Sequence, residues 1–419
     1  MSSLPSPDRD RLWGQLMELA EIREPDQPGF TRRLFSDAYR TSRARVAEWM
    51  AGAGLAVSTD SVGNLFGQLT GAEPGLAPIV VGSHTDTVAG GGRFDGTVGV
   101  LGAIELARLI REAGLELRHP LRVADFLGEE PNRFGLSCLG SRAVAGQLSP
   151  GHLDLKDGRG QTLGAALGAA GTHPEELAQA LWGEGSIHCY LELHIEQGRS
   201  LERSLARLGV VTVIAGISRA VIRVSGRQDH AGTTTMADRR DALAAAAETV
   251  LLVERLAQGD GSDESGVGTV GRLEVSPGAT NVVPGGATLW AEFRSSSPGW
   301  LDRRQPALEA GLAELEARRG VELSSEWVSA EPPTLCAASI RDAIGEAITQ
   351  LGEPALEIIS GASHDAVHLA HLGPMGMIFI PSREGRSHCP EEWTDPDQVA
   401  TGVAALLATV LRLDGQERL

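Results

Sequence analysis

The sequence contains few cysteines, and their spacing suggests neither a zinc knuckle nor a disulfide framework. Only four occur in 419 residues, far apart and without a Cys-x-x-Cys pair. Cysteines so few and so scattered are typical of a reducing compartment, where they play structural roles. We therefore expect a cytoplasmic protein with unpaired cysteines.

Long apolar runs and excess positive charge are also lacking. The N-terminal residues MSSLPSPDRDRLW lack the apolar core of a signal peptide, and no segment has the roughly 20 apolar residues of a membrane-spanning helix. The chain has 37 Lys and Arg against 55 Asp and Glu, a formal charge of −18. Because nucleic acids and anionic membranes attract positive surfaces, we expect neither as a partner.

The order of expected helices and strands indicates two domains, one inserted in the other. Residues 1–214 and 330–419 alternate strand-like and helical patterns, which favours a mostly parallel sheet with helices on both faces, an α/β catalytic domain that is discontinuous in sequence. Residues 215–329 follow the order β-α-β-β-α-β of a ferredoxin-like α+β module. A chain of 419 residues is long for a single core, which agrees with two domains.

Residues 79–95, IVVGSHTDTVAGGGRFD, contain the first chemically suggestive side chains. The β-branched run at 79–81 predicts a buried strand, with His84 and Asp86 just past its end, where open α/β sheets bind ligands. Asp95 follows a glycine-rich turn and could share a metal ion with His84. We interpret Asp86 as the carboxylate that fixes the imidazole tautomer of His84. A polar turn that only satisfies backbone groups is the alternative.

Three further segments end in candidate ligands. Glu129 and Glu130 follow an expected strand at 121–127, His194 ends an alternating segment at 189–194, and His388 lies near the C-terminus. Imidazoles combined with carboxylates suit Zn²⁺, Mn²⁺, Co²⁺ or Ni²⁺. Neighbouring glutamates leaving a strand point to opposite sides, so one can bind metal while the other acts as a general base. An exposed acidic turn is the alternative for this pair.

Seven segments resemble the signature blocks of the M20 peptidase-like amidohydrolases, in family order between about residues 60 and 395. Within that family they are similar to the branch of N-carbamoyl-L-amino-acid hydrolases, allantoate amidohydrolases and β-ureidopropionases. The segments are GSHTDTVAGGGRFDGTVGV, GEEPNRFGLSCLGSRAVAG, ELHIEQG, DHAGTTTM, GATNVVPGGATLWAEFR, SGASHDA and SHCPEE.

The resemblance implies two divalent transition-metal ions per subunit. Asp95 would bridge the ions, and Glu129 would be the general base that takes a proton from water. Asp86 would orient His84. The ligand set that the resemblance implies is His84, Asp95, Glu130, His194 and His388.

The inserted domain would serve as a lid and a dimerisation domain, with further matching residues. His230 matches a histidine that donates to the tetrahedral oxyanion, in relatives often from the partner subunit. Asn281 and Arg294 match residues that bind the substrate carboxylate, and Gln197 and His364 are expected on the substrate side. A capping or buried histidine, and a plain ion pair of the arginine with a protein acid, are the alternatives.

Some features lie outside this pattern. His364, His368 and His371 could share one helical face, which would suggest a separate metal site, but we interpret the last two as ordinary helix residues. The glycines at 90–92 lack the Lys-Ser/Thr of a phosphate loop. Pro131-Asn132 and Thr235 depart from the family pattern at the pocket rim, which leaves the particular substrate open.

The sequence therefore predicts a homodimeric, metal-dependent amidohydrolase. Its expected partner is a small ureido or amide acid, namely an N-carbamoyl-L-amino acid cleaved to the amino acid, CO₂ and ammonia. Allantoate, or another N-acyl amino acid, is the alternative substrate. A catalytically silent binding protein on the same fold is the alternative of another class; it would be expected to lack the base or the bridging ligand, whereas Glu129 and Asp95 are present.

Overall fold

The computed structural model describes residues 4–259, 264–416 and 419. The chain divides into two compact units. Unit 1 comprises Met1–Thr212, Cys336–Ser360 and His364–Leu419, and unit 2 comprises Val213–Leu335 with Gly361–Ser363. The inserted unit thus begins two residues before the expected boundary and ends six residues after it, and it gains a short segment from the C-terminal part of the chain.

Unit 1 is built on a sheet whose strand order is β1-β2-β4-β3-β5-β15-β6-β13, with β14 also paired to β6. The central strands β4, β3, β5 and β15 are parallel, while β1, β2 and β6 pair antiparallel. The expected mostly parallel sheet is therefore confirmed at its centre. The strands are β1 Ala56–Thr59, β2 Leu65–Leu69, β3 Ile79–His84, β4 Leu121–Phe126, β5 Cys189–Ile195, β6 Gly209–Ile214, β13 Thr334–Leu335, β14 Leu356–Ser360 and β15 Met375–Ile380.

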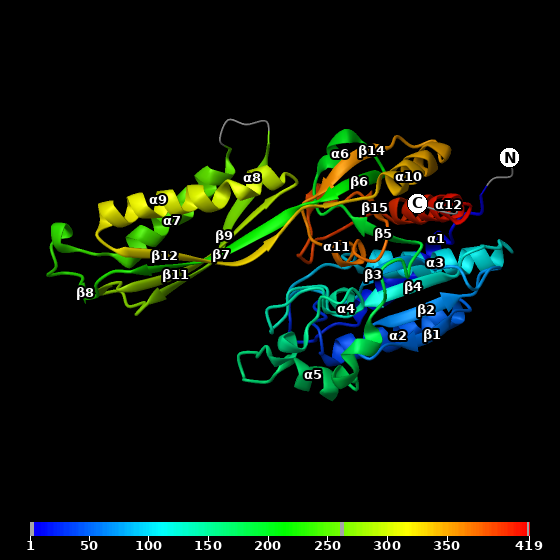
Figure 1. Ribbon diagram of the computed structural model, residues 1–419, viewed down its shortest axis with the longest axis horizontal. Coiled ribbons are helices and arrows are strands. Elements are labelled where there is room, and N and C mark those ends of the chain that lie inside the picture. Colours follow the sequence, from blue (N-terminus) through cyan, green and yellow to red (C-terminus); the bar gives the residue numbers. More distant parts are fainter. Residues whose placement is uncertain (1–3, 260–263, 417–418) are drawn as a thin grey trace. The chain divides into compact units, whose positions relative to one another are not determined.

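Helices cover both faces of this sheet, as expected (Figure 1). Helices α1, α3, α10 and α12 pack on one face, whereas α4 and α11 contact the sheet from the other. The helices of unit 1 are α1 Arg9–Glu21, α2 Asp37–Gly52, α3 Thr97–Glu112, α4 Leu139–Val144, α5 Leu163–Ala169, α6 Ser200–Ser204, α10 Ala338–Gln350, α11 Ala366–Leu369 and α12 Pro396–Asp414, with 3-10 turns at Pro150–Asp154, Pro174–Ala180 and Arg383–Gly385.

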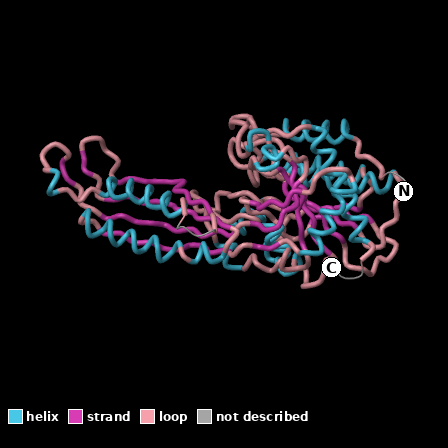
Figure 2. The backbone as a smooth tube through the Cα atoms, turned by 90° about the horizontal axis from the view of Figure 1, so that it is seen from above, coloured by secondary structure: helices cyan, strands magenta, loops and turns pink. Residues whose placement is uncertain are grey.

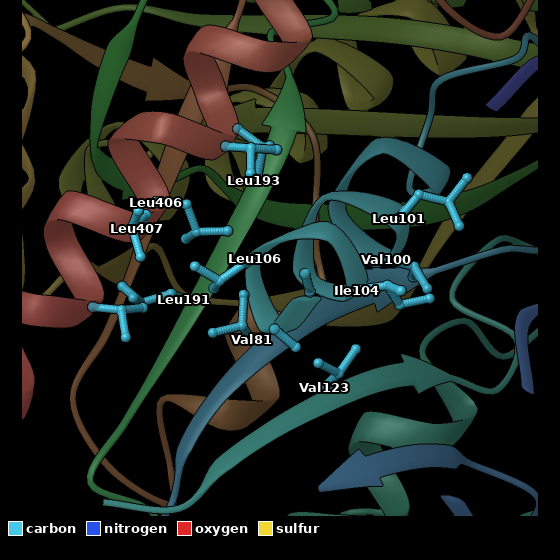
Figure 3. Packing of buried hydrophobic residues seen from close by; sticks show 14 of the residues in the cluster. Val81, Val100, Leu101, Ile104, Leu106, Val123, Leu191, Leu193, Leu406 and Leu407 are labelled. Atoms are coloured by element: carbon cyan, nitrogen blue, oxygen red, sulfur yellow. The ribbon is translucent and has the colours of Figure 1, made fainter. Parts of the chain in front are cut away.

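The main core lies between the parallel strands and α3 with α12. Val81 of β3 and Leu191 of β5 face Leu106 of α3 and Leu407 of α12, and all four side chains are fully buried (Figure 3). Helix α3 is buried around almost its whole circumference, because it contacts the sheet on one side and α1 and α12 on the other. Burial of this kind contributes about 1.5–3 kcal/mol per large apolar side chain. It gives the sheet a rigid base.

Unit 2 is a four-stranded antiparallel sheet with the order β12-β7-β11-β9, covered by α7 and α9. This is the ferredoxin-like arrangement expected from the sequence. Strand β11 alternates between half-buried and buried positions, since every second side chain packs against the helices. Figure 2 shows the helices and strands of this unit as long segments that lie side by side. The elements are β7 Gly216–Ser225, β8 Asp229–His230, α7 Ala242–Ala257, β9 Gly266–Ser276, β10 Val282–Val283, β11 Gly286–Ser295, α8 Pro298–Asp302, α9 Arg304–Arg319 and β12 Glu322–Glu331, with a 3-10 turn at Met236–Asp238.

Two local results complete the fold. Within the described part of the chain, no helix has both the length and the apolar character needed to cross a membrane.

The helix expected to carry three histidines is shorter than their spacing requires, because α11 spans only Ala366–Leu369. His364 and His371 therefore lie outside it, and the three imidazoles do not form one helical face.

Candidate metal centre and active site

The parallel strands of unit 1 bring the candidate ligands to one edge of the sheet. His84 is the last residue of β3, and His194 is the last but one of β5. Glu129 and Glu130 follow β4 after a turn of two residues, and His388 follows β15. Because parallel strands end at the same edge, side chains that are far apart in the sequence meet there. His84 and His194 belong to their strands rather than to the loops beyond them.

Asp95 lies at the centre of the cluster, and its two oxygens face different imidazoles. Oδ1 lies 3.1 Å from Nε2 of His194 and 3.7 Å from Nε2 of His84. Oδ2 lies 3.0 Å from Nε2 of His388. The His388 side chain is 50% exposed, whereas the side chains of His84 and His194 are each only 1% exposed. The cluster is therefore open to solvent on the His388 side.

Hydrogen bonds fix the tautomers of the two buried imidazoles. Nδ1 of His84 lies 3.1 Å from the carbonyl oxygen of Asp86, and Nδ1 of His194 lies 2.9 Å from that of Ile195. A nitrogen at this distance from a carbonyl oxygen must carry the proton, so in a neutral ring the lone pair is on Nε2. Nε2 of each ring lies within 3.7 Å of Oδ1 of Asp95, and an acceptor nitrogen this close to a carboxylate oxygen needs a cation between them.

A glycine is required beside these rings. Gly96 has a φ of 66°, and a Cβ at this position would lie 2.4 Å from the ring of His84. Its N–H donates to Nε2 of His194 at 3.1 Å. The Phe-Asp-Gly sequence therefore turns into α3 at a position where only glycine fits.

The two glutamates occupy different positions. Oε2 of Glu129 lies 3.5 Å from Nε2 of His84, whereas Oε1 of Glu130 lies 3.6 Å from Nε2 of His388. Both residues are buried, with 7% of Glu129 and 4% of Glu130 exposed. The carboxylate of Asp86 accepts the backbone N–H groups of Glu129 and Glu130, at 3.2 Å each, and lies 3.6 Å from Nδ1 of His84. Asp86 thus contacts the glutamate turn through its carboxylate and the imidazole mainly through its carbonyl.

Charges in the cluster shift the pKa values of its members. Burial, and then the negative charge of neighbouring carboxylates, raises the pKa of Glu129 and Glu130 well above the usual value, against the opposing charge of His84. Burial alone would raise the pKa of Asp95, but hydrogen bonds with His194 and His388 lower it well below its usual range. The pKa of His84 is raised well above normal by Glu129 and Asp86 despite burial. Without metal ions, protons on His84, Glu129 and Glu130 therefore balance the negative charge of the cluster.

The donor atoms fit a pair of divalent metal ions. Two groups of ligand atoms are close enough to hold a metal, His84-Asp95-His194 and Asp95-Glu130-His388, and they share Asp95. Oε1 of Glu130 is buried and has no hydrogen-bond partner among the described residues, which a coordinated cation would explain. Nitrogen and oxygen ligands of this kind suit Zn²⁺, Mn²⁺, Co²⁺ or Ni²⁺.

A third group, Glu192, His194 and His364, is also close enough for a metal ion. However, the carboxylate of Glu192 accepts hydrogen bonds from Ser83 at 2.6 Å and from Tyr190 at 3.0 Å. The ring of His364 contacts that of His194 edge-on, with centroids 4.6 Å apart. Hydroxyl donors already satisfy Glu192, so this group supports the ring of His194 rather than forming another metal site.

Glu392 and Ser387, for which the sequence predicted no role, also shape the cluster. Glu392 is fully buried and accepts the backbone N–H groups of Phe94 and Asp95 at 2.7 and 3.1 Å. Ser387 donates to Glu392 at 2.7 Å. Gln197, expected in the substrate pocket, donates to Oδ2 of Asp95 at 2.9 Å. Ser387 and Glu392 share one sequence block with His388, which indicates that they lie near this ligand but not that Glu392 contacts Asp95.

His230 and Asn281 lie together in unit 2. Strand β8 pairs with β10, and the N–H of Ala231 donates to the carbonyl of Asn281 at 3.0 Å. His230 is exposed, and its Nδ1 accepts the N–H of Gly232 at 3.1 Å. The neutral ring therefore carries its proton on Nε2, which is available as a donor.

Arg294 lies at the other end of the same unit. It donates to Glu292 at 2.6 Å and to the carbonyl of Gly361 at 3.0 Å. Strand β11 begins at Gly286, three residues after β10 of the β8–β10 ribbon, and Arg294 lies near the other end of that strand. Eight residues of strand separate Gly286 from Arg294, which at about 3.3 Å each is roughly 26 Å. His230 and Arg294 of one chain thus lie too far apart to touch one small molecule.

Comparison with known proteins identifies the family. Residues 80–412 match the model of peptidase family M20/M25/M40. The chain belongs to this family. Among curated members, it is 39% identical over 404 residues to the N-carbamoyl-L-amino acid amidohydrolase of Geobacillus stearothermophilus, covering 96% of this chain and 98% of that protein. It is 38% identical to the ureidoglycolate hydrolase of Oryza sativa subsp. japonica, covering 98% and 85%.

Solved structures of M20 relatives have the same fold. The crystal structure of AtUAH in complex with glyoxylate matches with a TM-score of 0.91 at 36% identity, covering 99% of both chains. An amidase of the hydantoinase/carbamoylase family from Burkholderia multivorans matches with a TM-score of 0.85 at 34% identity, covering 98% of this chain and 99% of that one. The expected membership of the M20 family, and of its amidohydrolase branch, is confirmed.

Proposed function

We propose that this protein is a dinuclear-metal amidohydrolase that cleaves N-carbamoyl-L-amino acids to the amino acid, CO₂ and ammonia. The observation that carries the proposal is Asp95, whose two oxygens each face the imidazole of a different ligand group. Relatives named for this activity, such as that from Geobacillus stearothermophilus, support the substrate class. The ions would be bound by His84, Asp95, Glu130, His194 and His388.

Bound divalent ions would lower the pKa of water and polarise the ureido carbonyl. Glu129 contacts His84 but belongs to neither of the ligand groups that share Asp95. Its carboxylate is therefore available to take a proton from the attacking water and to deliver it to the departing nitrogen. Asp86 holds the backbone of Glu129 and so fixes where the base lies.

Residues of unit 2 would bind the substrate in the dimer. The Nε2–H of His230 is a donor suited to an oxyanion, a contact worth about 3 kcal/mol in other hydrolases. Arg294 would bind the substrate carboxylate. A ureido acid is about as long as two extended residues, roughly 7 Å. His230 pairs with Val282, just before the Gly286 end of β11, and Arg294 lies about 26 Å from Gly286 along that strand. A substrate held by both His230 and Arg294 therefore requires two chains, and we propose a homodimer in which His230 and Asn281 come from the partner.

Ureidoglycolate is a second candidate substrate. The ureidoglycolate hydrolase of Oryza sativa subsp. japonica is nearly as similar in sequence as the carbamoyl amino acid enzyme, and AtUAH with bound glyoxylate has a TM-score of 0.91. Both reactions need the same metal ligands, the same base and a carboxylate contact. The two substrates differ in the chemical group beside the carboxylate and not in the reaction that they undergo.

The deciding experiment measures ammonia release by metal-reconstituted protein from a panel of ureido and N-acyl acids. We expect the highest kcat/KM for N-carbamoyl-L-amino acids. Faster turnover of ureidoglycolate or allantoate would support the second substrate class, and an absence of turnover across the panel would contradict the proposal.

The four unpaired cysteines agree with a cytoplasmic enzyme, which we also propose.

A further inference from the structure

A cavity of about 300 Å³ lies in unit 1, away from the cluster around Asp95. It is formed mainly by α2 and residues 170–172, with single residues from β1, β2 and the segment after β4, and none of its lining residues belongs to that cluster. Its wall is largely apolar, with Phe35, Tyr39, Ala47, Leu65 and Leu127 among the lining side chains. Ligand pockets are typically apolar, with one or a few placed polar groups, and begin at about this volume.

Two arginines line this cavity, the exposed Arg40, which pairs with Asp37, and the largely buried Arg43. The side chain of Arg43 is 12% exposed, and it stacks on the ring of Tyr39. Nη1 donates to the hydroxyl of Tyr39 at 3.0 Å and to the carbonyl of Asp125 at 3.2 Å, and Nη2 donates to the carbonyl of Gly63 at 2.6 Å. The nearest carboxylate, that of Asp125, lies 3.5 Å from Nη1.

These contacts leave one edge of the guanidinium unused. Arg43 has five N–H groups, and its hydrogen bonds to described residues use two on Nη1 and one on Nη2. The N–H of Nε and the second N–H of Nη2 remain, and this pair forms the fork that binds both oxygens of a carboxylate. No acidic side chain lines the cavity.

We propose that this cavity is a second ligand site, for a compact monocarboxylate with an aromatic or branched apolar body. The carboxylate would bind to the free edge of Arg43, and the apolar body would lie between Phe35, Leu65 and Leu127. A protonated amine would find no acidic partner among the lining residues, which excludes free amino acids as good ligands. The site is independent of the reaction proposed above, because it uses different residues.

The test is a calorimetric titration of the metal-loaded protein with phenylacetate and with its neutral amide, phenylacetamide. We expect one phenylacetate per chain at this site, with the amide at least tenfold weaker. Ala47→Leu, which fills the cavity from α2, should weaken phenylacetate at least tenfold. Ala51→Leu adds the same volume on the same helix but outside the lining, and should leave binding unchanged.

A second control separates this site from the substrate carboxylate site. Phenylacetate binding should persist in Arg294→Ala, since Arg294 does not line the cavity. Equal binding of acid and amide would overturn the proposed contact with Arg43. Unchanged affinity in Ala47→Leu, loss of affinity in Arg294→Ala, or no binding to the wild-type protein at millimolar concentrations would overturn the site itself.

Discussion

Oε2 of Glu129 lies 3.5 Å from Nε2 of His84, while Glu129 belongs to neither ligand group that shares Asp95. This relationship fits the proposed role of Glu129 as a base next to the metal ligands that is not itself needed to hold a metal. Glu129→Gln should therefore lower kcat by about 10²–10⁴-fold, the usual contribution of a general base. Metal content should remain that of the wild-type protein, measured by elemental analysis of the same sample. Near-normal turnover would remove Glu129 from this role.

Arg294 tests the contact with the substrate carboxylate. Arg294→Ala should raise KM for carboxylate substrates while kcat changes less, because the contact forms in the ground state as well as in the transition state. Arg294 also pairs with Glu292 at 2.6 Å, so Arg294→Ala could act through that partner alone. Glu292→Gln removes the ion pair but keeps the guanidinium. The assignment fails if KM rises in Glu292→Gln as it does in Arg294→Ala, or in neither variant.

The separation of His230 from Arg294 leads to a complementation experiment. His230→Ala and Glu129→Gln should each be nearly inactive. Mixing them under conditions of subunit exchange should restore about a quarter of the wild-type activity, since half the dimers are mixed and one of their two sites is intact. A chain that forms its site alone would show no recovery. Mixing His230→Ala with itself serves as the control.

His368 predicts a specific dependence of stability on pH. Burial lowers the pKa of His368 to about 3, from 6.5 in the unfolded chain, and the ring pairs with the side-chain oxygen of Gln147. A histidine whose pKa is lowered by folding binds its proton more readily when unfolded, so stability falls as the pH drops below 6.5. The expected loss is about 1.4 kcal/mol per pH unit, or about 2 kcal/mol between pH 6.5 and 5.

His368→Gln should flatten this part of the stability curve. The measurement is the urea midpoint at several pH values in both proteins, and the difference between them isolates His368 from the other titrating groups. His371→Gln, at an exposed position three residues away, is the control. Because the charge of His371 is only the smallest of the causes that lower the pKa of His368, His371→Gln should change the curve far less than His368→Gln. Parallel curves for wild type and His368→Gln would contradict the assignment of a buried neutral imidazole.

The sequence was sufficient for the elements that place the ligands. A β-branched run marks β3, an alternating pattern marks β5 and the apolar helical pattern marks α3. His84, Asp95 and His194 follow from their positions at the ends of these elements. Local pattern determines such features, because a buried parallel strand and its following helix need few distant contacts to be recognisable.

Other features depend on contacts that are distant in the sequence. Glu392 binds the backbone of Asp95 across nearly 300 residues, and no local pattern indicates that pairing. Asp86 was expected to orient His84 through its carboxylate, but that carboxylate lies closer to the N–H groups of the glutamate turn. The distance between His230 and Arg294 follows from strand register, which the alternation of residues along β11 does not reveal.

The proposed function depends on two metal ions that would share Asp95 as a ligand. The most direct test is the number of Zn²⁺ or Mn²⁺ ions bound per chain after reconstitution and removal of excess metal, in the wild-type protein and in His388→Ala. The wild-type protein should bind two ions and His388→Ala one, because only the group of Asp95, Glu130 and His388 loses a ligand. A single ion in the active wild-type protein, or the same number in both proteins, would contradict the account.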